Sequence, residues 1–292
     1  MIVNQAAISG IYKSFNTLFQ SALDQAKPVK DRVAMTVPSN ARSNTYAWID
    51  NLPMLREWLG ERVVRDLAAH GYEIVNKNYE GTVSVDRNDI EDDQIGAYRP
   101  IIEMLAYNAA MHPDKLIFDL LASGFTSTCF DGQYFFDTDH PVAGSSVSNY
   151  GGGSSSPWYL LCTSFPVRPL IFQSRQTPKF VSMDRETDEN VFMRRKFIYG
   201  VESRCSVGFG LWQLAYGSKQ TLDTTNYASA RAAMMGLRNE EGTPLGIVPS
   251  LLVVGRTGEA AGKAIVDAQF NPDGGSNVWF RSAELLVVPW LA

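Results

Sequence analysis

The residues whose types could do chemistry gather in one short stretch, CFDGQYFFDTDHP, at positions 129–141. It combines a thiol, three carboxylates and an imidazole with several aromatic rings. Carboxylate and imidazole groups at such close spacing can bind a metal ion, because oxygen ligands at alternating positions suit calcium. One interpretation is therefore a metal site, through Asp131, Asp137, Asp139 and His140.

A structural turn is the other interpretation of this stretch, and we favour it. The calcium loop of helix–loop–helix proteins has a glycine at its sixth position and a glutamate at its twelfth. Counted from Asp131, neither residue is present. Short Asp side chains accept hydrogen bonds from their own backbone and proline fixes φ, so DTDHP is a good turn former. We expect Phe135 and Phe136 to anchor this turn in a core.

A second stretch, GRTGEAAGKA at 255–264, follows the apolar run PSLLVV. A glycine-rich turn after a strand, with a lysine at a helix start, is similar to a phosphate-binding loop. That loop has four residues between its glycines and then Lys with Ser or Thr. Here Gly258 and Gly262 enclose three residues, and Ala264 stands where the hydroxyl would be. We favour a strand that leads into a helix at 258–266.

No residue is assigned a catalytic, cofactor-binding or metal-binding role. The sequence has no nucleophile elbow of the Gly-x-Ser-x-Gly type. The basic run RRK at 194–196 is interpreted as a solvated or interface patch rather than a contact to DNA phosphates. A hydrolase or nucleotide-binding enzyme, using the 131–140 turn or the 258–263 loop, is the alternative function from a different class.

Composition indicates a folded, soluble protein. The chain has 292 residues, a formal net charge of -5 and an ordinary apolar content of 45%. This charge excludes a global basic signature of nucleic-acid binding. The three cysteines, at 129, 162 and 205, are too widely spaced for a disulfide framework or a zinc site and favour a reducing place of synthesis. No apolar run approaches the about 18–20 residues that span a bilayer, and no secretory signal is expected.

The elements that must position the 129–141 stretch mix helices with strands, so the predicted class is α+β. Apolar spacing of three and four predicts helices at 8–23, 54–68, 97–122 and 225–238. Pro113 should kink or restart the third helix, and Gly124 should stop it. Strands are expected at 72–74 and 83–85, with NKNYEG as the turn of a charged hairpin, and in KFIYGVESRCSVGFG, PSLLVVG and ELLVVPWLA. AGSSVSNYGGGSSSPW, at 143–158, has the composition of a flexible loop.

Three segments in this order carry a resemblance to a known family. They are YEIVNKNYEGTVSVDRNDIEDDQIGAY, AAMHPDKLIFDLLASG and FDGQYFFDTDHP. The chain resembles the major head subunits of Mu-like phages, which have the Hong Kong 97-like capsid fold. The resemblance implies an N-terminal arm at 1–55 and an extended loop at 56–86. It also implies a peripheral domain with a long spine helix at 87–140 and 263–292, and an axial domain at 141–262.

The same resemblance implies a structural role. The protein would assemble with itself, as pentamers and hexamers, into the icosahedral shell of a Mu-like phage or prophage. Scaffolding protein and portal are implied partners, and a decoration protein is a further candidate. The shell would enclose double-stranded DNA without sequence recognition, would need no cofactor or membrane, and would be assembled in the cytoplasm of the bacterial host. Without a long charged helical leader, no fused scaffolding segment is expected.

Overall fold

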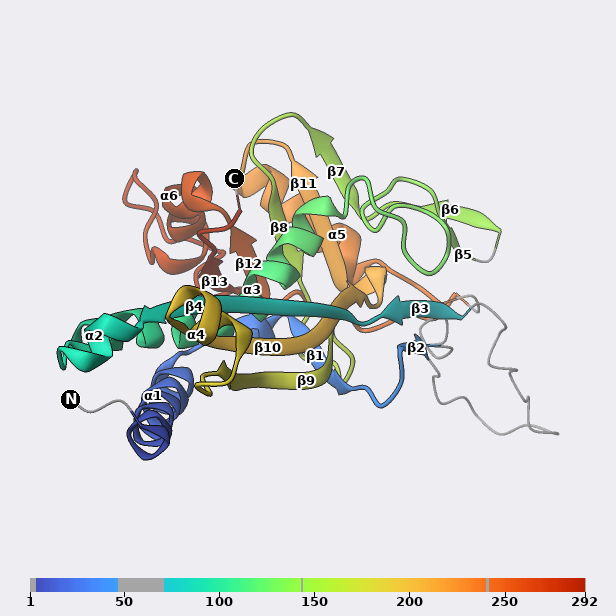
Figure 1. Cartoon of the computed structure of the whole chain (residues 1–292). Coiled ribbons are helices and arrows are strands. Elements are labelled where there is room, and N and C mark those ends of the chain that lie inside the picture. Colours follow the sequence, from blue (N-terminus) through green and yellow to red (C-terminus); the bar gives the residue numbers. More distant parts are fainter. Residues whose placement is uncertain (1–3, 47–70, 143, 240–241, 292) are drawn as a thin grey trace.

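The computed structural model describes residues 4–46, 71–142, 144–239 and 242–291. The fold is α+β: two long helices lie along a four-stranded sheet, and a five-stranded sheet lies at one end of that assembly (Figure 1). One apolar core lies between the long helices and the four-stranded sheet, and a larger core surrounds the five-stranded sheet. No helix in the described ranges is long and apolar enough to cross a membrane.

Helix α1 (Gln5–Gln25) confirms the helix predicted at 8–23. The side chain of Asn4 caps it by accepting the backbone N–H of Ala7 at 2.9 Å. Its apolar stripe is buried against strands: Phe15 meets the ring of Tyr199 edge-on, and Phe19 meets Phe180. The amphipathic pattern therefore has a partner within the same chain.

Helix α3 (Arg99–Ser123) confirms the long helix predicted at 97–122, and Gly124 is its C-cap as expected. Pro113 lies inside the helix, and no new helix starts there. Packing outweighs the loss of one backbone hydrogen bond at Pro113, since Ile102, Ala106, Ile117, Phe118 and Leu121 are all fully buried.

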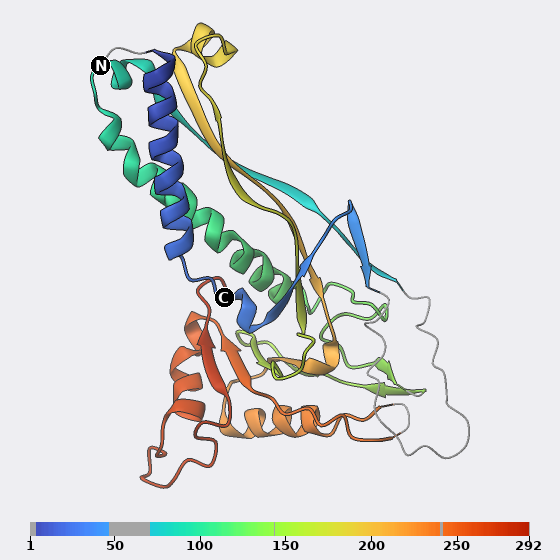
Figure 2. The ribbon, with the colours of Figure 1, turned by 90° about the horizontal axis from the view of Figure 1, so that it is seen from below.

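The four-stranded sheet has the order β1-β9-β10-β4, with β1 (Ala34–Pro38) parallel to β9 (Leu170–Met183). Strands β9 and β10 (Lys196–Phe209) form a long antiparallel hairpin, and helix α4 (Glu189–Arg194) lies at its end. Strand β4 (Lys77–Asp86) pairs with β10 along its whole length. Short helix α2 (Arg87–Glu91) then leads toward α3 (Figure 2).

The predicted charged hairpin is wrong. Residues 76–81 form no turn, because β4 runs through them and pairs with β10, while β3 (Tyr72–Val75) pairs with β2 (Ser43–Tyr46). Asn76 separates β3 from β4 and its amide donates to Ser39 Oγ and the Ala41 carbonyl. Strand partners more than 100 residues away, not the local turn signal, determine the pairing.

The five-stranded sheet has the order β13-β12-β8-β11-β7. The bounds are β7 (Tyr150–Gly153), β8 (Trp158–Leu161), β11 (Ala215–Lys219), β12 (Leu251–Val254) and β13 (Glu284–Val287). Helix α5 (Thr224–Met235) confirms the helix predicted at 225–238. Helix α6 (Glu259–Gly262) continues as a π-helical turn over Lys263–Asp267, which confirms the expected helix after β12.

The predicted loop at 143–158 is wrong in part. Strand β6 (Ser145–Val147) pairs with β5 (His140–Val142), and β7 joins the five-stranded sheet. Gly153 lies in the left-handed region with φ of 94°, and a Cβ there would meet the carbonyl oxygen of Lys219 at 2.2 Å. The glycines thus permit close strand pairing. The helix predicted at 54–68 lies outside the described residues.

Candidate functional site

The 129–141 stretch forms a corner between helix α3 and the five-stranded sheet. Phe135 and Phe136 are buried, as predicted. The ring of Phe135 stacks on Phe209 with centroids 4.4 Å apart, and Phe136 lies 5.4 Å from the ring of Tyr159. The backbone N–H of Phe136 donates to the carbonyl of Gly124, which joins the corner to the end of α3.

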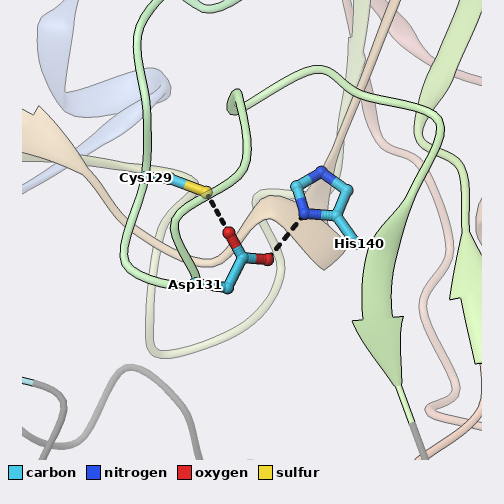
Figure 3. A group of neighbouring side chains, drawn as sticks. All are labelled: Cys129, Asp131 and His140. Carbon is cyan, nitrogen blue, oxygen red and sulfur yellow. Dashed lines mark hydrogen bonds and ion pairs between the residues drawn. The ribbon is translucent and has the colours of Figure 1, made fainter. Parts of the chain in front are cut away.

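Three reactive side chains meet inside this corner, and we call Cys129, Asp131 and His140 the corner cluster (Figure 3). The thiol of Cys129 donates to Asp131 Oδ1 at 3.0 Å. The other oxygen, Oδ2, lies 2.7 Å from Nδ1 of His140. Because the His140 side chain is fully buried, the carboxylate is its polar partner in place of water.

Asn149 determines how the His140 ring is held. Its amide nitrogen donates to the carbonyl of Phe135 at 2.8 Å, so its Oδ1 atom faces Nε2 of His140 at 3.2 Å. This oxygen can accept a hydrogen bond from Nε2. The imidazole also stacks on Trp212, with the ring centroids 4.0 Å apart. The corner cluster is thereby connected to β7 and to the turn before β11.

The ionisation of the corner cluster suits a structural link rather than a nucleophile. Burial alone would raise the pKa of Asp131, but hydrogen bonds from His140 and Cys129 outweigh it and lower that pKa. Burial and the adjacent Asp131 raise the pKa of the Cys129 thiol far above its usual range. Since the thiolate is the reactive form, this cysteine is a poor nucleophile at neutral pH.

Among the described residues, the corner cluster is also a group of ligand-type atoms that could hold a metal, because its three ligand atoms lie within 4.8 Å of one another. A metal would have to displace the proton of Cys129 and the one between His140 and Asp131, since ligands bind deprotonated. Each of these atoms already has a hydrogen-bond partner. The observed arrangement accordingly needs no ion to be satisfied.

The four residues of the alternative metal interpretation are not all brought together. Asp131 and His140 meet, but Asp137 instead accepts the backbone N–H groups of Tyr134 and Thr138. Asp139 is exposed on the turn. Asp137 thus has the backbone role that was expected, whereas Asp131 has a side-chain role that was not.

Sequence reasoning missed two members of this network, Cys129 and Asn149. Cys129 had a usable signal, since it lies two residues before Asp131. Asn149 had none, because it lies in a segment with the composition of a loop. His70 lies outside the described residues. His112, on α3, packs edge-on against Tyr79 of β4.

The glycines of the 258–263 loop serve packing. A Cβ at Gly262 would meet Leu285 Cδ1 at 2.7 Å, and one at Gly258 would meet Cβ of Val254 at 3.0 Å. Lys263 forms an ion pair with Glu259 on the same helical surface. The turn therefore brings a short helix close to β12 and β13.

Comparison with known proteins agrees with this structural role. Residues 8–291 match the family described as Mu-like prophage major head subunit gpT. The chain belongs to this family. It is 39% identical to the major capsid protein of Escherichia phage Mu over 95% of both chains. It is 40% identical to the Mu-like prophage FluMu major head subunit of Haemophilus influenzae, over 85% of this chain and 84% of that one.

Solved capsids give the same assignment for the fold of this Mu-like head subunit. The procapsid protein of bacteriophage JBD30 superposes with a TM-score of 0.88 at 43% identity, over 99% of this chain and 100% of that one. The JBD30 capsid protein gives 0.81 at 32% identity over 100% of both chains. The protein is a major capsid protein with the Hong Kong 97-like fold and forms part of a virion shell. Its role is structural, so the hydrolase and nucleotide-binding alternative has no support.

Proposed function

We propose that copies of this head subunit assemble as pentamers and hexamers into an icosahedral shell around a double-stranded DNA genome. The observation that carries the proposal is the full-length match to the JBD30 capsid protein.

We propose that the chain consists of four parts. The arm is placed at 1–55, the extended loop at 56–86, the peripheral domain at 87–140 and 263–292, and the axial domain at 141–262. Strand pairing suggests two adjustments within this scheme. Strand β4 hydrogen-bonds to β10 beside α3, which favours β2 and β3 as the base of the extended loop. Strand β13 pairs with β12, which favours a shared sheet for 263–292 and the axial segment.

Scaffolding and portal proteins are proposed partners of the assembling shell. The JBD30 capsid has been solved decorated with minor capsid protein trimers. A trimeric minor capsid protein is therefore a further proposed partner here. The net charge of -5 is consistent with a wall that does not bind the packaged DNA tightly.

Negative-stain electron microscopy of the expressed protein, alone and with a scaffolding partner, tests the proposal. Closed particles of uniform size are expected. Permanently monomeric protein at every concentration and with every partner would contradict it. A binding assay with duplex DNA at low and high salt tests the second part, and tight salt-sensitive binding by free subunits would contradict that part.

A further inference from the structure

An exposed apolar tip stands at the end of the β9–β10 hairpin. Helix α4 presents Phe192, 80% exposed, and Met193, 69% exposed, followed by Arg194. We call these three residues the α4 tip. Figure 2 places α4 at the end of the long strands, near the start of α1. Exposed side chains of this size at adjacent positions are typical of an interaction surface.

The α4 tip is held rigidly. The Asn190 amide donates to the carbonyls of Met183 and Lys196, at 3.0 and 2.7 Å, and so ties the two strands together. Val191 is buried beneath, while Arg195 closes the helix in the left-handed conformation. Phe192 and Met193 are thus presented outward by a fixed frame, which lowers the entropy lost on binding.

A groove of about 870 Å³ lies between α1 and α3, and we call it the α1–α3 groove. Apolar side chains from both helices line it, and two of them, Met104 and Tyr107, are 59% and 49% exposed. Leu18, Ala22 and Met111 also belong to this lining. Methionine-rich grooves adapt well to an inserted aromatic ring.

Charges at the tip and the groove are complementary. Glu103 stands on the α3 wall of the groove and Lys27 on the α1 side. The tip carries Arg194, with Glu189 at the start of the same helix. Within the described part of the chain, none of these four side chains forms an ion pair. Arg194 can therefore face Glu103 while Glu189 faces Lys27.

We propose that the α4 tip of one copy inserts Phe192 and Met193 into the α1–α3 groove of a neighbouring copy, with Arg194 beside Glu103. The inference rests on the proposed function, because it names one of the contacts that build the shell. The tip and the groove are different surfaces, so the contact between two copies is head-to-tail. Such contacts, repeated around a rotation axis, form a closed ring of copies. Each copy then offers one tip and fills one groove.

Cysteine cross-linking in assembled particles tests the contact directly. Two versions of the chain, one with Met193→Cys and one with Met104→Cys, are co-assembled with different tags. We expect a disulfide between the two versions under mild oxidation. The native cysteines are buried, so they contribute little background. As a control, Met235→Cys, 47% exposed on α5, replaces Met193→Cys and should give no link to Met104→Cys.

Charge reversal gives an independent readout. Arg194→Glu or Glu103→Arg alone should lose closed particles, and the two together should recover them. Closed particles of the co-assembled Met193→Cys and Met104→Cys versions that lack the cross-link, or in which Met193→Cys links only to itself, overturn the contact and leave the shell function intact. Failure of the wild type to form particles with any scaffolding partner would overturn the proposed function instead.

Discussion

The carboxylate of Asp114, within α3, accepts the backbone N–H of Lys30 at 2.8 Å. Its second oxygen accepts the N–H of Val29 at the same distance. Asp114 is fully buried, so this pair of hydrogen bonds joins the segment after α1 to the middle of the spine helix. Burial raises the pKa of Asp114, and the two backbone N–H groups lower it in part.

Asp114→Asn should destabilise this junction. The amide has almost the same size, but its nitrogen would face a backbone N–H, leaving two buried donors opposed. We expect a loss of about 1–3 kcal/mol in the free energy of unfolding, measured by urea denaturation. Asp119→Asn is the control, since its ion pair with Lys115 is exposed and should be worth at most about 1 kcal/mol. Equal stability of Asp114→Asn and the wild type would contradict this.

Asp131→Asn should remove a pH-dependent part of the stability. The folded pKa of Asp131 is lowered, so its carboxylate stabilises the fold above the unfolded pKa of about 3.9. That contribution is lost as the pH falls through the folded pKa. The difference in unfolding free energy between wild type and Asp131→Asn should thus be largest near neutral pH and shrink in acid. A difference that grows in acid would show the opposite sign of the shift.

Phe135→Ala should leave a cavity beneath the corner. Its ring is fully buried and stacks on Phe209, so a loss of about 3–5 kcal/mol is expected. Tyr134→Ala is the neighbouring control, because Tyr134 is 45% exposed and should cost much less. Thermal unfolding followed by circular dichroism compares the two, and equal losses would indicate that Phe135 is not an anchor.

Gly208→Ala should push β3 away from β10. A Cβ at position 208 would lie 2.2 Å from Ile74 Cδ1 and 3.1 Å from the ring of Tyr72. We expect destabilisation and faster proteolysis near β3. Shortening the obstructing side chain tests the cause: the double variant Gly208→Ala, Ile74→Ala should resist protease better than Gly208→Ala alone. If Ile74→Ala adds its own loss without any recovery, the close contact is not the reason.

The β3–β4 region shows where local reading of a sequence fails. NKNYEG has turn-forming residues, and isolated from the rest of the chain it predicts a hairpin. In the fold, β10 provides a partner for every residue of β4, so the segment stays extended. The corner cluster is a similar case. The partners of His140 cannot be predicted from local spacing alone, because Asn149 and Trp212 contact its ring from positions farther along the chain.

The sequence by itself determined the helices α1, α3 and α5, the strands β12 and β13, and the burial of Phe135 and Phe136. These depend on apolar periodicity and on caps within a few residues, which are local properties. Only the tertiary structure decided which strands pair, which acid meets His140 and where apolar side chains remain uncovered. Those outcomes depend on contacts between segments far apart in the chain, and hydrogen bonding in a sheet is satisfied by whichever edge the packing brings close.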